Sequence, residues 1–412
     1  MTVERDLMET EVQSPALPAF VEARSLHSLV LLGFSTYLLA FARRVSSASI
    51  RVYVIDLVSN PRGFVRRSNA VEPDGITLNW SAVGTPAGLE TIHHFVNRVH
   101  ADALLTTDDF SLTWLGKNRA RFEPACRLMI PQPEILEPLL DKAHQIELAR
   151  ECGFDLLPTW TLASAEAIAA IPNVAFPVVV RPSLNDSARP VFKALVMNTR
   201  EDLDRLCAQT QWSRAPIAQP FRLGPNYVLH GMRSESGEML ALRLFKAYRK
   251  YRGFTTSMAP VHLSSGMEKS ARRFVEAAGL TGPFHFELLG SDADDRLYFL
   301  EINCRLGGTT AKAMQLGYDE PGLLLEAFNL HGPEPLPLLR VYPRATTISL
   351  NLVQALDALR NRRDPLAYPQ PSRMRTFFAA IKEALTVHDG LVDLRDLYSW
   401  LWLLKVRKGS RI

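Results

Sequence analysis

The most informative stretch of this 412-residue sequence is a pair of mainly apolar runs, Phe284-His-Phe-Glu287-Leu-Leu-Gly290 and Leu297-Tyr-Phe-Leu-Glu301-Ile-Asn303-Cys-Arg305. The polar connection between the two runs predicts a β-hairpin. Side chains alternate between the faces of a strand, so Glu301, Asn303 and Arg305 share one face and Cys304 turns toward the core. A turn centred near residue 294 would place Glu287 directly across from Glu301.

Two carboxylates that face each other in a sheet require compensation. Like charges in this position are destabilising, so either their pKa values rise or a divalent cation binds between them. Glu287, Glu301 and the amide of Asn303 are hard oxygen ligands, which suit Mg²⁺. Arg305, on the same face, is placed to meet a phosphoryl group. The alternative is a solvated hairpin face, and the in-register Asn303 and Arg305 argue against it.

The composition is that of a globular protein, with 47% hydrophobic and 22% charged residues. This excludes global disorder, and a net charge of +4 gives no support for nucleic-acid binding. The four cysteines show no metal-binding spacing and predict reduced thiols. We recognise no signal peptide and no apolar run long enough to span a bilayer, so we expect a soluble, cytoplasmic protein.

The chain changes character along its length. Residues 1–24 are acidic and contain two prolines, and we expect a mobile tail. Strands over 28–33 and 50–55, with a helix over 38–44 between them, predict a Rossmann-like layer, in a structural role because GxGxxG is missing. Residues 135–153 predict one continuous helix, and a proline-rich stretch beyond residue 331 leads into a basic C-terminal module.

The hairpin resembles the ATP-grasp superfamily, which includes biotin carboxylase, carbamoyl phosphate synthetase and D-alanine–D-alanine ligase. Its residues are similar to the metal signature Glu…Glu-x-Asn-x-Arg. The runs Leu104-Leu-Thr-Thr-Asp-Asp109 and Leu139-Leu-Asp-Lys142 are similar to a branch of carboligases close to D-aspartate ligase. The resemblance implies an α/β and α+β multidomain fold. Its expected parts are the tail (1–24), a Rossmann-like pre-ATP-grasp domain (25–130), a small lobe (131–221), a large lobe with the metal site (222–330) and a C-terminal extension (331–412).

The resemblance also implies ATP and Mg²⁺, with Mn²⁺ as the alternative metal, and assigns roles to particular residues. Glu287, Glu301 and Asn303 are the expected metal ligands. The expected phosphate-binding cations are Lys142, Arg181 and Lys193. The expected adenine-binding linker consists of Gln219, Pro220, Phe221 and Arg222. The expected ribose-binding residue is Asn226, where relatives have glutamate.

Two loops complete the expected site. Relatives carry a glycine-rich flap, but residues 183–190 contain no glycine. We therefore expect this flap to use side chains such as Arg189 and Lys193, and the alternative is a flap that closes less fully than in relatives. The basic run 246–253 is expected to be a loop whose Arg249 and Arg252 hold a carboxylate or the transferred phosphate. A solvated charged face is the alternative interpretation of that run.

The implied function is an ATP-dependent carboxylate–amine ligase that forms an amide through an acyl phosphate and releases ADP and phosphate. Its expected catalytic residues are Arg305, Arg181, Arg252 and Arg249. The expected partners are a small-molecule carboxylate and an amine, with no nucleic acid and no membrane span. The sequence itself indicates no oligomeric state, and the resemblance implies only that a homodimer is common among relatives. An ATP-grasp kinase or a carbamoyl- or carboxyphosphate-forming enzyme is one alternative, and a non-catalytic ATP-binding protein is the other.

Overall fold

The computed structural model describes residues 23–396, with gaps at 34, 58–64, 292–295, 363, 365–366 and 370–371. The tail predicted over 1–24 (except its last two residues) and residues 397–412 of the predicted C-terminal extension lie outside the described part of the chain.

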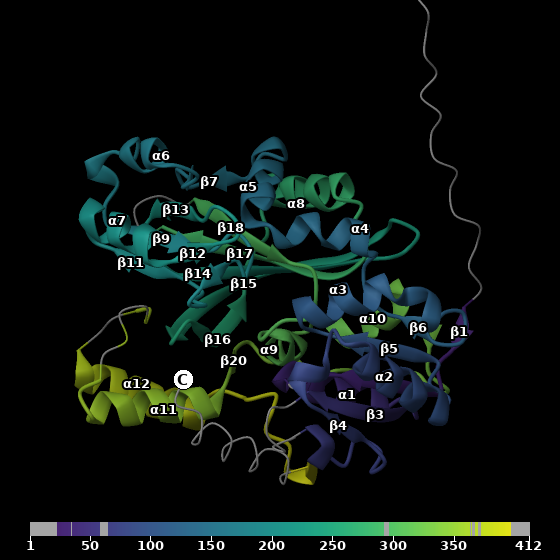
Figure 1. Ribbon diagram of the computed structural model, residues 1–412. Coiled ribbons are helices and arrows are strands. Elements are labelled where there is room, and N and C mark those ends of the chain that lie inside the picture. The colour runs from purple at the N-terminus through teal and green to yellow at the C-terminus, as the bar shows by residue number, and fades with distance from the viewer. Residues whose placement is uncertain are drawn as a thin grey trace, which may run out of the picture.

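The N-terminal layer is the Rossmann-like unit that the sequence predicts. Its five-stranded sheet has the order β4-β3-β2-β5-β6, and every pairing is parallel. Helices cover the sheet, as expected for a parallel sheet with two apolar faces (Figure 1). The strands are β2 Ser28–Leu32, β3 Arg51–Leu57, β4 Ile76–Leu78, β5 Ala103–Thr106 and β6 Arg127–Leu128, and the helices are α1 Thr36–Ser46, α2 Pro86–Arg98 and α3 Asp109–Lys117.

A small lobe follows, with its own sheet and core. The four-stranded sheet β11-β9-β13-β8 is antiparallel. Strands β10 and β12, which alternate in sequence with the strands of this sheet, form a separate two-stranded antiparallel sheet. Leu162, Val178 and Leu203 belong to its separate apolar cluster. The strands are β8 Trp160–Thr161, β9 Val178–Arg181, β10 Ala188–Arg189, β11 Leu195–Met197, β12 Gln211–Trp212 and β13 Ile217–Pro220, and the helices are α6 Ala165–Ala169 and α7 Arg200–Gln209.

The single helix predicted over 135–153 is wrong. The structure has a short helix α4 (Pro133–Leu136), a 3₁₀ turn (Pro138–Leu140) and a helix α5 (Lys142–Glu151). The break lies at Pro138, which has no N–H to donate to a preceding turn. Asp141 is then extended, and its side chain accepts a hydrogen bond from the Ala143 N–H at 2.9 Å. This cap makes Lys142 the first residue of α5.

The large lobe is built on a seven-stranded sheet of order β20-β16-β15-β14-β17-β18-β7, antiparallel except for β7. Phe154, Phe274, Phe286 and Phe299 pack edge to face, tilted or stacked in its core. The strands are β7 Asp155–Leu156, β14 Asn226–Arg233, β15 Met239–Tyr251, β16 Phe254–Pro260, β17 Gly282–Gly290, β18 Leu297–Asn303 and β20 Ala345–Thr346, and the helices are α8 Ser265–Ala277, α9 Thr310–Gln315 and α10 Glu320–Ala327.

The basic run 246–253 is mostly strand, which corrects the prediction of a loop. Residues up to Tyr251 belong to β15, and Arg252 and Gly253 turn the chain into β16 with φ of 49° and 75°. A two-residue turn with positive φ at both positions matches the twist of a β-hairpin. Cross-strand pairing with β16 therefore keeps the run extended despite its charge.

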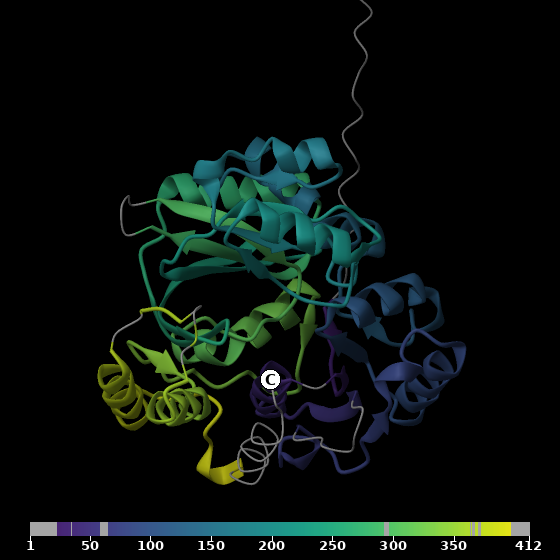
Figure 2. The same cartoon turned by 60° about the vertical axis from the view of Figure 1, so that its left-hand side comes forward.

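The C-terminal extension contains an antiparallel helical hairpin of α11 (Ile348–Leu359) and α12 (Arg373–Thr386). Figure 2 shows this hairpin and the N-terminal layer on opposite sides below the two lobes. A short parallel pair, β1 (Arg24–Ser25) with β19 (Leu330–His331), joins the start of the described chain to the end of the large lobe. No described helix has both the length and the apolar composition needed to cross a membrane.

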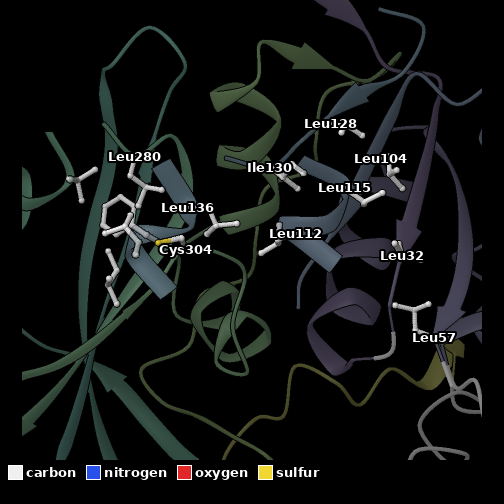
Figure 3. Close-up of a cluster of buried hydrophobic side chains, with 14 of the residues drawn as sticks. Leu32, Leu57, Leu104, Leu112, Leu115, Leu128, Ile130, Leu136, Leu280 and Cys304 are labelled. Atoms are coloured by element: carbon white, nitrogen blue, oxygen red, sulfur yellow. The ribbon is translucent and has the colours of Figure 1, made fainter. Parts of the chain in front are cut away.

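One apolar cluster runs from the N-terminal layer into the large lobe. Figure 3 shows Leu104 and Leu115 on one side and Leu280 and Cys304 on the other, with Leu136 between them. Cys304 is buried, as its place on the strand predicts. The contiguous core fixes the N-terminal layer against the lobe that carries the candidate site.

Candidate functional site

The two predicted metal-ligating carboxylates face each other as the sequence predicts. Glu287 of β17 pairs directly with Glu301 of β18, and His285 pairs with Asn303. The register shifts immediately afterwards, because Leu288 pairs with Phe299 and leaves Leu300 as an extra residue. The Leu300 carbonyl accepts a hydrogen bond from Nη2 of Arg181 at 3.0 Å, so this irregularity ties the small lobe to the carboxylate pair.

The electrostatics of this pair fit a divalent cation. Burial, followed by the nearby charge of Glu301, raises the pKa of Glu287 to about 7. A bound cation would reverse both effects, because it favours the ionised form. The described residues contain no group of three or more His, Cys, Asp or Glu side chains placed to hold a metal. The candidate donor set is therefore two carboxylates and the amide oxygen of Asn303, a set that suits a cation retaining water and phosphate ligands.

Cations from two elements converge on Glu301. Nη1 of Arg181, at the end of β9, lies 3.4 Å from Oε2 of Glu301. Nζ of Lys142, at the start of α5, lies 4.0 Å from the same oxygen. Burial lowers the pKa of Lys142, while the Glu301 carboxylate opposes this effect. The structure thus brings Lys142 and Arg181 to the carboxylate pair.

Arg305 lies beside Asn303 and is held by the N-terminal layer. Its Nη2 donates to Oδ1 of Asn303 at 3.3 Å, and its Nε lies 2.6 Å from Oδ1 of Asp109. The sequence analysis assigned no role to Asp109, which begins α3 three residues after the end of β5. Only the packing of α3 onto the large lobe brings this carboxylate to Arg305.

The predicted adenine-binding linker joins the two lobes. Gln219 and Pro220 end β13, and Phe221 and Arg222 lead toward β14. The side chain of Gln219 is buried and bonds to Arg181, with Oε1 3.0 Å from Nη2. The guanidinium of Arg222 lies 5.3 Å from the ring centre of Tyr298. These contacts fix the position of the linker. The contacts between the linker and a nucleotide stay a prediction.

The glycine-free flap is organised by serine hydroxyls. Ser183 donates to the carboxylate of Asp141, and Ser187 donates to the Leu184 carbonyl at 2.8 Å. Arg189 bonds to the backbone carbonyls of residues 186 and 188, at 2.5 and 2.9 Å. Arg189 therefore supports the flap as expected, whereas Lys193 is exposed and the structure does not bring it to the carboxylate pair.

The structure does not bring Arg249 and Arg252 to the carboxylate pair. Nη1 of Arg249 lies 3.1 Å from Oε2 of Glu383 in α12, and Nη2 of Arg252 lies 2.6 Å from Oδ2 of Asp357 in α11. Both arginines thus hold the C-terminal hairpin. The physical reason differs for the two: the strand conformation directs Arg249 away from its neighbour Lys250, and Arg252 lies in the turn beyond the strand.

The side chain of Lys250, the residue after Arg249, extends in a different direction and reaches Asn226. Its Nζ donates to Oδ1 of Asn226, the predicted ribose-binding residue, at 3.1 Å. Burial lowers the pKa of Lys250, and the charge of Glu287 opposes this effect. Sequence reasoning missed Lys250 because it treated the run as a loop; alternation along a strand would have separated residues 249 and 250.

No protein-family model and no curated protein matches the chain. Solved structures do match. N5-carboxyaminoimidazole ribonucleotide synthetase in complex with ADP is 13% identical, with a TM-score of 0.61 over 89% of this chain and 98% of that one. The biotin carboxylase domain of 2-oxoglutarate carboxylase from Hydrogenobacter thermophilus is 14% identical (TM-score 0.58; 74% and 70% covered). L-amino acid ligase from Bacillus licheniformis is 14% identical (TM-score 0.55; 75% of each chain covered).

The shared architecture confirms the predicted fold class. The chain has the ATP-grasp fold. In chain order, a Rossmann-like layer precedes the two lobes and a C-terminal extension follows them.

Proposed function

We propose that this protein is an ATP-dependent carboxylate–amine ligase that forms an amide bond through an acyl phosphate. The observation that carries the proposal is the convergence of Lys142 and Arg181 on the paired carboxylates Glu287 and Glu301. A cluster of two acids and two cations at a lobe junction is suited to holding a metal-bound triphosphate. The ADP complex of one structural neighbour and the ligase activity named for another support the same reading.

In this proposal, Glu287, Glu301 and Asn303 hold Mg²⁺, or Mn²⁺ in its place. When bound, the metal neutralises the negative charge of the phosphates. Its arrival favours the ionised form of Glu287, whose pKa of about 7 leaves the carboxyl partly protonated at neutral pH. The linker residues 219–222 and Asn226 contact the nucleoside, with Lys250 beside Asn226.

The proposed chemistry has two steps. A substrate carboxylate oxygen attacks the γ-phosphorus of ATP, the bond from that phosphorus to ADP breaks, and an acyl phosphate forms. Lys142, Arg181 and Arg305 stabilise the phosphoryl group during its transfer, so this chain contributes positioning and electrostatics. An amine then attacks the acyl carbon, and the bond from this carbon to the phosphate oxygen breaks with its electron pair leaving on phosphate. The proton lost by the amine is taken up by the released phosphate. No step requires a covalent nucleophile from the protein.

The flap formed by residues 183–190 lies next to Lys142 and covers this intermediate in the proposed mechanism. It hydrogen-bonds to the start of α5 through Asp141 and to Lys142, whose N–H donates to the Ser183 carbonyl at 3.0 Å. Closure of such a loop excludes water, which would otherwise hydrolyse the acyl phosphate. We expect the active protein to be a cytoplasmic homodimer.

The test is release of ADP and phosphate from Mg-ATP in the presence of amino acids and other carboxylates, singly and in pairs. We expect release that requires one carboxylate and one amine, with a product whose mass equals their sum minus water. Glu301→Gln keeps the side-chain shape and should lower the rate at least ~100-fold, whereas Glu90→Gln, on the surface of the N-terminal layer, should not. Release with a single substrate would replace the ligase by a kinase-type reaction, and binding without turnover of any pair would contradict an enzyme.

A further inference from the structure

A carboxylate of the N-terminal layer bridges two of the cations at the candidate site. Oδ1 of Asp109 lies 2.6 Å from Nε of Arg305, and Oδ2 accepts a hydrogen bond from Nδ2 of Asn185 at 3.0 Å. Oδ1 of Asn185 in turn accepts from Nζ of Lys142 at 3.0 Å. One side chain of α3 therefore connects the end of β18, the flap and the start of α5.

These contacts leave little freedom for the Arg305 guanidinium. Its Nε is bound to Asp109, its Nη2 to Oδ1 of Asn303, and its Nη1 to the Leu306 carbonyl at 3.4 Å. Because the guanidinium is planar, fixing Nε and Nη2 fixes the direction of all five donors. The bond to Asp109 is charge-assisted and short, and it is the strongest of the three by this criterion.

Asp109 also sets the direction of Lys142. Since Nδ2 of Asn185 donates to Asp109, Oδ1 of the same amide is directed at the Lys142 ammonium. Lys142 is then held between Asn185 and Oε2 of Glu301, at 3.0 and 4.0 Å. Without the carboxylate, the amide has no fixed direction and the lysine loses its neutral partner.

We propose that Asp109 is a positioning residue that aligns Arg305 directly and Lys142 through Asn185 for the terminal phosphate of ATP. Docking of the N-terminal layer then completes the phosphate site, which the two lobes alone leave unfinished. The role of the two cations rests on the proposed function, whereas the network itself rests only on the geometry above.

The chain offers a matched control for an ordinary ion pair between domains. Arg127 of β6 pairs with Glu235, in the turn between β14 and β15, and this pair also joins the N-terminal layer to the large lobe. Within the described part of the chain, Glu235 contacts neither the carboxylate pair nor its cations, so Glu235→Gln removes an interdomain ion pair without disturbing the network.

The experiment compares Asp109→Asn, Asp109→Glu and Glu235→Gln in the full-length chain. Calorimetry measures their affinities for Mg²⁺ with β,γ-imido-ATP and for Mg²⁺ with ADP. We expect Asp109→Asn to weaken binding of the triphosphate analogue about tenfold while ADP binding changes less than about twofold. Asp109→Glu, which keeps the charge, should recover part of the loss, and Glu235→Gln should change neither affinity. A wild-type preference for the triphosphate in Asp109→Asn would overturn the proposal.

Failure of the proposed function is recognised separately, either because the wild-type protein binds neither nucleotide or because it binds them and the turnover test above shows no reaction that requires both an acid and an amine. The positioning contact is tested separately by urea unfolding of Asp109→Asn, Arg305→Gln and the double variant. Non-additive effects would show that Asp109 holds Arg305 even without nucleotide, and additive effects would overturn the proposal at its first step.

Discussion

Glu287 and Glu301 place two carboxylates side by side in a sheet whose neighbouring residues are largely apolar. Phe286, Leu288 and Ile302 flank them and are buried. Burial and the Glu301 charge together give Glu287 a pKa of about 7. The side-chain cations at the site thus do not fully offset the burial and the like charge at Glu287, and the resulting loss of stability in the ligand-free protein can be measured.

Replacing Glu287 by glutamine should stabilise the ligand-free protein at pH 8. The raised pKa means that the folded protein keeps a proton that the unfolded chain releases as the pH rises from about 4.5 to about 7. The wild-type protein thus loses stability across this window, and the neutral glutamine does not. We expect Glu287→Gln to be more stable by up to about 3 kcal/mol at pH 8, with the difference vanishing well below pH 4.5.

Urea unfolding at the two pH values, without Mg²⁺ or nucleotide, measures this difference. Leu385→Ala, a change at an exposed side chain far along the sequence, serves as the control. A glutamine variant that is less stable than wild type at pH 8 would contradict the account.

Residue-level prediction succeeded where a period of two residues decides the outcome. Alternation in the hairpin is sufficient to place Glu301 and Asn303 on one face and to put Glu287 opposite Glu301. It failed for Lys250, because a run of four cations suggested a loop. It could not assign Asp109, since the partner of that carboxylate is almost 200 residues away and only tertiary packing brings the two together.

At the scale of elements, helix α11 buries a row of polar side chains and exposes several leucines, the opposite of what hydropathy predicts. Asn351, Gln354 and Asp357 face the sheet and are buried, while Leu352 and Leu356 remain 43% and 44% exposed. The reason lies in β15, whose Arg249 and Arg252 require polar partners from the helix. Hydropathy alone predicts the opposite orientation, so this docking mode could not be deduced from the sequence.

Glu383 of α12 is the residue on which this docking depends most clearly. Its carboxylate accepts from Ser257 at 2.9 Å and pairs with Arg249 and Arg344. We expect Glu383→Ala to destabilise the protein by ~3 kcal/mol, because two arginines lose their partner and Arg249 is largely buried. Hydrogen exchange should show faster exchange in α11 and α12, with β17 and β18 unchanged.

The exposed Leu385, two residues along the same helix, provides the matched control, and Leu385→Ala should leave exchange unchanged. Equal protection in Glu383→Ala and wild type would show that the hairpin does not depend on these ion pairs.

At the scale of the whole molecule, the N-terminal layer is bound to the large lobe by both apolar and charged contacts. Beside the shared core, the Arg44 guanidinium of α1 binds both carboxylate oxygens of Asp319 and donates to the Pro337 carbonyl at 2.7 Å. Asp319 also caps α10, accepting from the Gly322 N–H. Arg44 thus links three segments that are distant in sequence.

Removal of Arg44 should weaken this attachment. We expect Arg44→Met to lower the free energy of unfolding by about 2 kcal/mol, because a buried, bidentate pair is lost while the apolar stem is kept. Urea denaturation followed by tryptophan fluorescence measures the change. Glu90→Gln, which breaks an exposed pair with Arg121, should stay within about 0.5 kcal/mol of wild type. An equal effect of the two substitutions would argue against a special role for Arg44.

The overall architecture was predictable because two parts of the chain carry a local pattern. The N-terminal layer has a parallel βαβ rhythm, and the large lobe has a hairpin with opposed acids. The orientation of α11 was not predictable in the same way, because it depends on the arginines that β15 presents to the helix, and no local pattern contains that information. The break at Pro138 follows from a local signal, the proline without an N–H, which the predicted continuous helix ignored.

The most direct test of the central claim is calorimetric titration of β,γ-imido-ATP into the wild-type protein and Glu301→Gln, each with Mg²⁺ and with EDTA. We expect wild-type binding to weaken at least about tenfold when Mg²⁺ is removed, and the remaining affinity of the variant to be independent of Mg²⁺. Wild-type binding of equal strength in EDTA, or an undiminished Mg²⁺ effect in Glu301→Gln, would contradict the assignment of Glu287, Glu301 and Asn303 as the metal site.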